Sequence, residues 1–227
     1  MKKPEVELEF SDKYTREHAE RYFKKHSTGL RRRMSTWREV QIARKALHMA
    51  GDPNLVLDLP CGAGRFWSMR AEKQNGVIIG ADNSADMGAV ACKQQPAEVV
   101  ARVKPMQTSA FAIDLPDNAV DSIFSMRLIH HIGQPKDRAL MLKEFHRVSR
   151  DSVLISLWVD GNYKAWKKSR GRKRLDVAAD GSAYQNRFVI PAKTIEAEFR
   201  EAGFIVQDHL DYIPMWAMWR IYILRKA

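Results

Sequence analysis

The stretch that decides the fold is Leu55-Val56-Leu57-Asp58-Leu59-Pro60-Cys61-Gly62-Ala63-Gly64-Arg65-Phe66. An apolar run of strand length ends in an acid, and a turn with two glycines follows. We interpret the stretch as a buried strand, a loop and the start of a helix. Because glycine has no Cβ, the main-chain N–H groups of the loop can approach a bound molecule closely. Open α/β sheets bind ligands at the carboxyl ends of their strands, so Asp58 is a candidate binding residue.

A second apolar run also ends in an acid. Residues 77–81 read as another buried strand, and Asp82 stands at its end, where a carboxylate can accept hydrogen bonds from ribose hydroxyls. The dinucleotide pattern G-x-G-x-x-G is absent, because position 60 is Pro and position 67 is Trp. The sequence therefore favours a nucleoside without phosphates over a dinucleotide.

These motifs resemble those of the class I S-adenosylmethionine-dependent methyltransferases, in particular the small bacterial, type-11-like members whose first motif reads D-x-P-C-G-x-G. The resemblance covers the chain from about Leu55 to its C-terminus. It implies an α/β fold with a seven-stranded, mainly parallel, doubly wound sheet of order 3-2-1-4-5-7-6, in which the last strand is antiparallel. It also implies S-adenosyl-L-methionine as the cofactor and S-adenosyl-L-homocysteine as the product. A Rossmann-like domain with an empty site is the alternative.

The resemblance assigns the glycine loop to the methionine part of the cofactor and the second acid to its ribose. In the family an acid after the third strand bonds to the adenine amino group, but Ser109 stands there in this chain. Backbone groups near Ala110 and the ring of Phe111 are then the candidates for the adenine contact. The expected cofactor-binding residues are Asp58, Pro60, Cys61, Gly62, Gly64, Arg65, Phe66, Asp82, Asn83, Ser109, Ala110, Phe111 and Met126.

The composition predicts one α/β domain with appendages and an anionic partner. The chain has 227 residues, and 38 Lys and Arg against 27 Asp and Glu give a net charge of +11. Such an excess favours a phosphorylated substrate, a nucleic acid or a membrane surface, with a basic surface kept for solubility as the alternative. Cys61 and Cys92 form no metal or disulfide pattern, so we expect no metal site. Without a secretion signal or a membrane-spanning apolar run, we expect a cytoplasmic protein.

We expect a helical arm or lid at residues 1–34 and a methyltransferase domain at residues 35–227. Tyr14, His18 and Tyr22 share one face of a helix in the arm. The arm either folds over the cofactor, with Tyr14 as a base and Tyr22 and His26 as substrate contacts, or packs on the sheet by its aromatic rings. A capping-box pattern at Thr36 and Glu39 predicts a helix from Trp37 to about Met49.

The remaining elements follow from apolar runs and turn residues. A helix capped by residues 83–87 should end near Pro96, and residues 99–103 form a strand unless residues 97–102 are partly helical. The passage from Ile113 to Ser125 resembles the family's "LPF-x-D-x-x-F-D" motif. The later elements expected are a fourth strand at 120–125, a helix at 139–148, a turn at Asp151, a fifth strand at 152–158, a helix at 192–202 ended by Gly203, and strands at 204–210 and 219–225.

The segment after the fourth strand faces the transferred methyl group in the proteins that this chain resembles. His130 or His131 is therefore a candidate base or acceptor contact, and Arg127 a substrate contact. The alternative for the histidine pair is packing on the methionine part of the cofactor. The N-P-P-Y and D-P-P-Y motifs of base methylation are absent after this strand.

A basic insertion at residues 159–191 should lie over the acceptor. Seven Lys and Arg fall within residues 164–174, beside Tyr163 and Trp166. Such clusters attract phosphates. Trp166 either stacks on a base or sugar or holds the loop to the core, and the aromatic residues at 216 and 219 either pack in the core or touch a lipid surface. The substrate contacts expected here are Trp166, Arg170, Arg172 and Arg174.

These observations lead to three functional hypotheses. The first is methyl transfer to an anionic acceptor, a phosphorylated sugar or glycolipid of the lipopolysaccharide type. The second is methyl transfer to RNA or another nucleic acid. The third is a regulatory protein with a methyltransferase fold, because Arg170-x-x-x-Arg174 resembles the arginine pair of cyclic-di-GMP receptors of the PilZ type.

Overall fold

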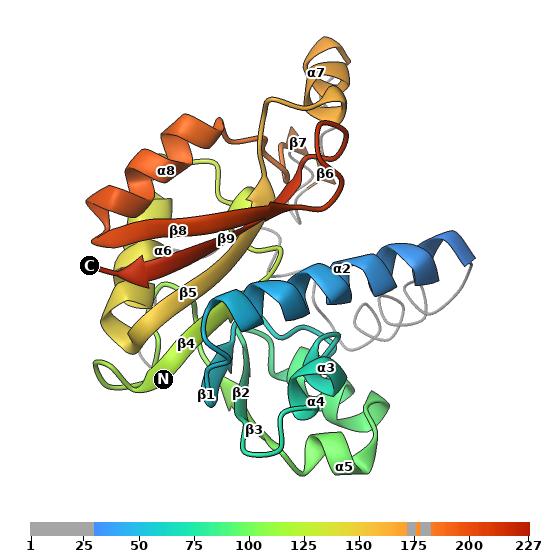
Figure 1. Cartoon of the computed structure of the whole chain (residues 1–227), viewed down its shortest axis with the longest axis vertical. Coiled ribbons are helices and arrows are strands. Elements are labelled where there is room, and N and C mark those ends of the chain that lie inside the picture. The colour runs from blue at the N-terminus through green and yellow to red at the C-terminus, as the bar shows by residue number, and fades with distance from the viewer. Residues whose placement is uncertain (1–29, 172–175, 178–182) are drawn as a thin grey trace.

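The computed structural model describes residues 30–171, 176–177 and 183–227 and shows one large sheet with helices on both faces (Figure 1). The strand order is β3-β2-β1-β4-β5-β9-β8, which in chain order of the sheet strands is 3-2-1-4-5-7-6. The predicted fold class and strand order are therefore confirmed. The strands are β1 (Leu55–Asp58), β2 (Val77–Asp82), β3 (Val103–Gln107), β4 (Val120–Ser125), β5 (Ser149–Trp158), β8 (Phe204–Asp211) and β9 (Trp219–Lys226).

Strand β1 lies at the centre of the parallel part of the sheet. It pairs in parallel with β2 and with β4, so Asp58 lies opposite Gly80 on one side and Phe124 on the other. Strand β9 runs antiparallel to both β5 and β8. The carboxyl ends of β1, β2, β4 and β5 therefore meet at one edge of the sheet, where α/β folds bind ligands.

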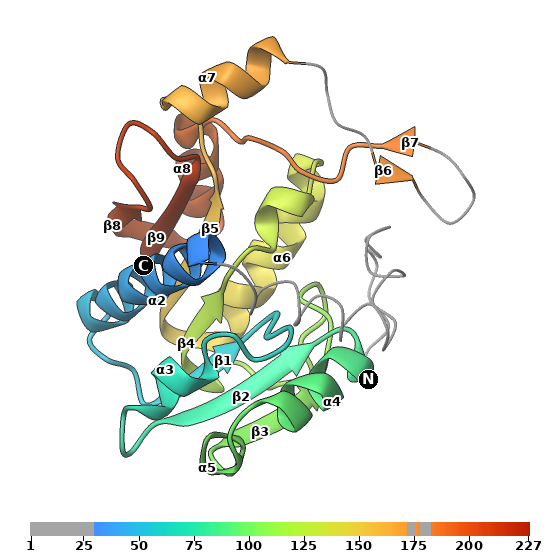
Figure 2. The ribbon, with the colours of Figure 1, turned by 90° about the vertical axis from the view of Figure 1, so that its right-hand side faces the viewer.

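Helices cover both faces of the sheet (Figure 2). Alternate residues of the strands pack against the opposite helix layers. On one face Val56 joins the cluster under α2, and on the other Leu57 joins the cluster under α6 and α8. A strand buried on both faces explains why Leu55-Val56-Leu57 is an unbroken apolar run. The helices are α2 (Leu30–Met49), α3 (Trp67–Ala71), α4 (Ala85–Gln94), α5 (Ala97–Val100), the 3-10 turn η2 (Ile129–His131), α6 (Pro135–Val148), α7 (Tyr163–Arg170) and α8 (Ala192–Glu201).

Helix α2 begins earlier than predicted. It starts at Leu30 and takes in the run of three arginines, so the predicted capping box at Thr36 is wrong. No Gly or Pro interrupts residues 30–49, and a helix with uninterrupted propensity needs no cap inside it. The expected division between residues 34 and 35 falls inside this helix and stays a prediction, while residues 1–29 lie outside the described part of the chain.

Three further boundaries differ from the sequence prediction. Residues 97–100 are helical and the third strand is β3, so the strand predicted at 99–103 is wrong and its helical alternative is confirmed. Pro105 is accommodated because β3 is an edge strand. Helix α6 starts at Pro135 rather than Ala139, since Pro suits the first helical turn. Strand β5 follows α6 at Ser149 without the turn predicted at Asp151.

The C-terminal elements follow the prediction closely. Helix α8 ends before Gly203, which has a φ of +88°, and the two last strands form the expected antiparallel pair. Within the insertion, α7 is followed by two short paired strands, β6 (Asp176–Val177) and β7 (Ala183–Tyr184). Helix α7 stands apart from the sheet at its carboxyl edge (Figure 1).

Gly80 offers a test of the packing beneath the glycine loop. A Cβ at Gly80 would lie 2.5 Å from the Trp67 ring and 2.9 Å from Val103 Cγ1. We expect Gly80→Ala to destabilise the fold by about 1 to 3 kcal/mol through overpacking, as measured by urea unfolding.

Gly88 in α4 provides the matched control, because a Cβ there meets nothing within 4 Å. Gly88→Ala should stabilise the chain by about 0.5 to 1 kcal/mol, since alanine favours a helix interior. Equal effects of the two substitutions would contradict the packing described for Trp67.

Candidate active site

The glycine loop is held by backbone bonds to two neighbouring strands. Leu59 N donates to Phe124 O at 3.1 Å, and Cys61 N donates to Ala81 O at 2.8 Å. Gly62 and Gly64 have φ values of +53° and +70°, which explains the glycines in this turn. Among the predicted contacts, Pro60 is half-buried and Cys61 is buried. Burial raises the pKa of the Cys61 thiol well above its usual value, so Cys61 is a neutral thiol and no nucleophile.

Asp58 lies beneath this loop and is almost fully buried. Its Oδ2 accepts a hydrogen bond from Trp67 Nε1 at 3.1 Å, whereas its buried Oδ1 has no hydrogen-bond partner among the described residues. Burial raises the pKa of Asp58 to about 8, although the charge of Arg70 and the Trp67 bond oppose the rise. A buried acceptor without a partner indicates that a ligand group or water belongs beside Oδ1.

Asp82 ties the second strand to the glycine loop. Its Oδ2 accepts from Gly62 N and its Oδ1 from Ser84 N, both at 3.0 Å. Burial raises the pKa of Asp82, and these N–H bonds oppose the rise. Asp82 is half-buried, and each carboxylate oxygen has a second lone pair, so the side chain can also accept from ribose hydroxyls.

The residues predicted to contact adenine bond to nearby backbone or pack against the core. Ser109 is buried, and its Oγ accepts from Phe111 N at 3.2 Å, so the hydroxyl stabilises its own turn. Ala110 is also buried, and Phe111 packs against the core. Asn83 is exposed beside Asp82, and its carbonyl accepts from Gln107 Nε2 at 3.1 Å. Their predicted cofactor contacts stay predictions.

Glu39 joins the two sides of the site through two arginines. Arg65 Nη1 lies 2.9 Å from Glu39 Oε2, and Arg127 Nε lies 2.6 Å from Glu39 Oε1. Arg127 follows β4 with a φ of +64°, and its guanidinium lies over the Trp219 ring at 4.9 Å. The ion pair thus connects α2, the glycine loop and the end of β4. A substrate anion at Arg127 would have to compete with Glu39.

Sequence reasoning missed the role of Glu39, although a signal was present. Glu39 is the only acid between residues 30 and 49, a stretch rich in Lys and Arg, and it falls on the buried side of α2. Buried acids are normally paired, so an isolated acid on an apolar helix face indicates a partner.

Phe66 and Met126, predicted as cofactor contacts, pack in the core cluster under α2, where the rings of Phe66 and Phe124 are 5.1 Å apart.

The histidine pair lies among aromatic rings at the ends of β4 and β5. His130 is 2% exposed, and its ring centroid is 5.2 Å from that of Trp158 and 4.8 Å from that of Trp219. Burial lowers the pKa of His130 well below its usual value, helped by His131 and nearby arginines. His130 is therefore neutral at pH 7. Its Nδ1 and the Trp158 Nε1 are buried without hydrogen-bond partners among the described residues.

His131 has a different environment. Its Nδ1 lies 2.6 Å from both the carbonyl oxygen and the Oδ1 of Asn186, so His131 holds the returning end of the insertion. Phe188 N donates to the His130 carbonyl at 2.8 Å in the same region. Of the two candidate bases, His130 has an Nδ1 without a hydrogen-bond partner among the described residues, whereas the Nδ1 of His131 is bonded to Asn186.

The other predicted substrate contacts divide by position. Trp166 and Arg170 lie on α7, about half exposed and exposed respectively. Outside the described residues lie Tyr14, Tyr22, His26, Arg172 and Arg174, the last of which is the second arginine of the cyclic-di-GMP pattern.

Among the residues described, no His, Cys, Asp and Glu form a cluster that could hold a metal ion. No helix in the described ranges has the length and apolar character needed to cross a membrane.

Comparison with known proteins agrees with this geometry. Residues 56–152 match the family described as "Methyltransferase domain". The chain has the fold of the magnesium protoporphyrin IX methyltransferase of Synechocystis PCC 6803 with bound S-adenosylhomocysteine, with a TM-score of 0.65 and 15% identity over 88% of this chain and 89% of that one. Residues 56–152 thus match a methyltransferase domain, and the chain has the fold of a methyltransferase that binds S-adenosylhomocysteine.

The chain is also similar to a second solved structure and to a curated tRNA-modifying protein. A structure described as a sarcosine dimethylglycine methyltransferase of Galdieria sulphuraria gives a TM-score of 0.65 at 14% identity, over 86% of this chain and 88% of that one. A tRNA U34 carboxymethyltransferase of Shewanella frigidimarina is 32% identical over 117 residues, 48% of this chain. The chain spans 33% of the length of that relative.

The residues of this site fit S-adenosylmethionine as the cofactor of the domain. The Asp58 carboxyl has an oxygen without a partner among the described residues, and the loop glycines leave room for close approach of a ligand. Asp58, Gly62 and Gly64 would hold the methionine part, and Asp82 the ribose. The cofactor supplies a methyl group that its sulfonium charge already activates, so the protein has chiefly to align an acceptor with it.

The buried carboxyl of Asp58 should make the stability of the fold depend on pH. Between about pH 4 and pH 8 the folded chain keeps a proton that the unfolded chain releases, so wild-type stability falls as the pH rises through this window. The variant Asp58→Asn has no carboxyl group to titrate at this position, so its stability lacks this dependence on pH. Its stability relative to wild type should rise by up to about 1.4 kcal/mol per pH unit over this window, as measured by urea unfolding.

Asp208→Asn is the control for this experiment, because Asp208 is exposed on β8. Its stability relative to wild type should stay constant over the same pH range. Parallel pH profiles of wild type and Asp58→Asn would show that the carboxyl titrates normally and would contradict the described burial.

Proposed function

We propose that the chain transfers a methyl group from S-adenosylmethionine to an RNA acceptor. The observation that carries the methyl transfer is the pair of acids at the ends of adjacent parallel strands, with the glycine loop bonded to the second of them. Such a site holds the nucleoside and leaves the methyl group to face the ends of β4 and β5. His130, neutral and with Nδ1 unpartnered among the described residues, lies there.

The choice of RNA rests on charge, on exposed aromatic rings and on one relative. The chain has a net charge of +11, and α7 presents Trp166 and Arg170 to solvent. Basic and aromatic side chains together suit a polyanion whose bases can stack. The relative from Shewanella frigidimarina is described as acting on tRNA. The phosphorylated sugar or glycolipid predicted first from the sequence finds no support among the matched proteins.

The direct test is incorporation of a radiolabelled methyl group. Purified protein with S-adenosylmethionine should label unmodified tRNA transcripts or total RNA, while lipopolysaccharide and phosphorylated glycans stay unlabelled. Labelling of the glycans alone would replace RNA by the first hypothesis. Absence of transfer to every acceptor, with the protein still folded, would contradict the proposed activity.

Asp82→Ala tests the cofactor site separately. We expect its affinity for S-adenosylhomocysteine to fall about 10- to 100-fold in calorimetric titration, because a carboxylate that binds the ribose and fixes Gly62 is removed. Asp208→Ala on the exposed part of β8 should bind like wild type. Unchanged affinity of Asp82→Ala would place the ribose elsewhere.

His130→Phe tests the acceptor side. The phenyl ring preserves packing against Trp158 and Trp219 but removes the unpartnered Nδ1. If His130 accepts a proton from the acceptor, turnover should fall about 100-fold or more while the affinity for S-adenosylhomocysteine changes little. Equal turnover of His130→Phe and wild type would leave His130 a purely structural role.

A further inference from the structure

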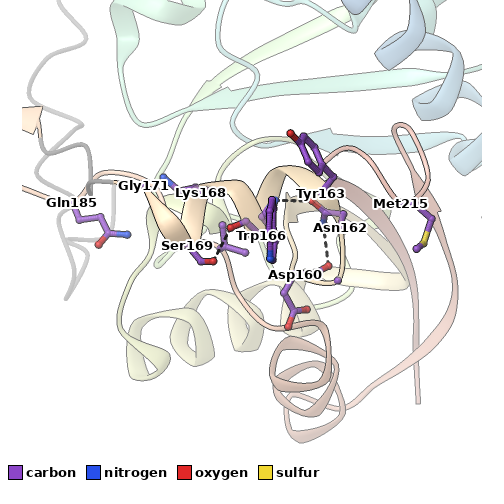
Figure 3. A pocket seen from close by; sticks show the side chains of 12 residues that line it. Asp160, Asn162, Tyr163, Trp166, Lys168, Ser169, Gly171, Gln185 and Met215 are labelled. Carbon is purple, nitrogen blue, oxygen red and sulfur yellow. Dashed lines mark hydrogen bonds between the residues drawn. The ribbon is translucent and has the colours of Figure 1, made fainter.

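Helix α7 and the loop between β8 and β9 border an open hollow of about 970 Å³ (Figure 3). Its wall includes Tyr163 and Trp166 on the helix and Met215 on the loop, all of them exposed. Asn162 and Ser169 add polar groups. None of the residues that line it belongs to the glycine loop, so the hollow is separate from the cofactor site.

Three aromatic rings form a continuous exposed surface beside this hollow. The rings of Tyr163 and Trp216 are stacked, with centroids 4.6 Å apart and planes inclined by 17°. The ring centroid of Trp166 is 5.8 Å from that of Tyr163. These side chains are 42 to 51% exposed. A contiguous aromatic surface that the protein leaves open to solvent indicates a binding surface.

Backbone bonds hold the two sides of this surface together. Tyr163 N donates to Met215 O at 2.9 Å, and Lys164 N donates to Trp216 O at 3.1 Å. Asn162 Oδ1 accepts from Ala165 N at 2.9 Å and begins the helix. The first N–H groups of α7 are thus bound to a loop about fifty residues later in the chain, so the rings are positioned before a ligand arrives.

The charge of α7 complements a polyanion. The helix carries Lys164, Lys167, Lys168 and Arg170 and no acid, and the Arg170 guanidinium lies 4.2 Å from the centroid of the Trp166 ring. Asp160 is the acid among the residues lining the hollow, and its Oδ1 is engaged by Ala192 N at 2.9 Å. Cations and stackable rings therefore occur on the same short helix.

We propose that this hollow binds an unpaired stretch of RNA, with bases stacked on Trp166 and on the Tyr163–Trp216 pair and phosphates at the cations of α7. Bases of a single strand expose their faces for stacking, whereas a duplex hides them. A lipid surface would need a protruding apolar face, but this surface is hollowed and includes polar groups. The inference rests on the proposed function, because the stretch would belong to the RNA that is methylated.

A chain of ring contacts joins the hollow to the acceptor side of the active site. The Lys168 ammonium lies 5.5 Å from the centroid of the Trp158 ring, and that ring packs on His130. Helix α7 also begins five residues after β5 ends. RNA held on α7 can therefore place a neighbouring nucleotide near His130.

The test is fluorescence anisotropy of the full chain with a labelled ten-nucleotide RNA that cannot pair with itself. Trp166→Ala and Trp216→Ala should each weaken binding about tenfold or more, since stacking of a base on an aromatic ring is lost. Trp166→Phe should bind within about threefold of wild type. Lys167→Gln and Arg170→Gln should each lower the salt dependence of binding by about 0.7 in the log–log slope.

Matched controls come from the amino-terminal ends of β8 and β3, which lie away from the carboxyl edge of the sheet where α7 stands. Ile205 on β8 is 57% exposed, and Lys104 on β3 is exposed. Ile205→Ala and Lys104→Gln should bind the RNA like wild type. Each variant's thermal unfolding and its affinity for S-adenosylhomocysteine show that the fold and the cofactor site are retained.

Three outcomes would overturn the inference. One is equal binding of single-stranded RNA and of a duplex of the same length. Another is RNA binding by Trp166→Ala and Trp216→Ala that matches wild type. The third is loss of sedimentation with phosphatidylglycerol vesicles in these variants while RNA binding is unchanged.

Failure of the proposed function has a separate signature. If the protein binds no S-adenosylhomocysteine and methylates no RNA while the two tryptophan variants still lose RNA binding, the methyl transfer is wrong and the RNA surface stands. If RNA is methylated while the tryptophan variants bind RNA like wild type, only the RNA surface is wrong.

Discussion

The site depends on one buried side chain, the indole of Trp67. The ring fills the space left by the absent Cβ atoms of Gly64 and Gly80, and its N–H group donates to the Asp58 carboxylate. It thereby fixes the distance between β1, β2 and the loop that connects β1 to α3. In a dinucleotide-binding fold a third glycine occupies this place and allows close helix–strand packing. Here the tryptophan takes up that space itself, and the glycine needed for packing is found in β2 instead.

Glu39 connects the glycine loop to the end of β4. Its carboxylate, which α2 supplies, is shared by Arg65 of the glycine loop and Arg127 at the end of β4. Charges this strongly buried are retained only where they are paired. The position of α2 is therefore linked to the conformation of both loops. The ring of Trp219 under Arg127 extends the same connection to the His130 cluster.

The two acids could be predicted from apolar runs whose ends are marked by turn residues, whereas the order of the sheet was implied by the resemblance to a known family. Prediction from the sequence failed where local signals competed. The apolar run at residues 99–103 fits a strand or a helix by composition, and tertiary pairing decides for β3. The pattern at Thr36 is a genuine cap signal overridden by continuous helix propensity. Contacts between distant segments, such as Glu39 with Arg127 or Tyr163 with Trp216, have no local signal, since they depend on how the chain returns to itself.

The position of β9 has a consequence for synthesis of the protein. This strand follows every other strand of the sheet along the chain, yet it lies in the interior between β5 and β8. Until residues 219–226 leave the ribosome, the outer edge of β5 has no neighbour, and unpaired edges can join to other chains. Trp219 arrives with the same strand and completes the aromatic surroundings of His130. A growing chain therefore cannot complete the aromatic cluster around His130 before its sheet is closed, which couples formation of this cluster to completion of the fold.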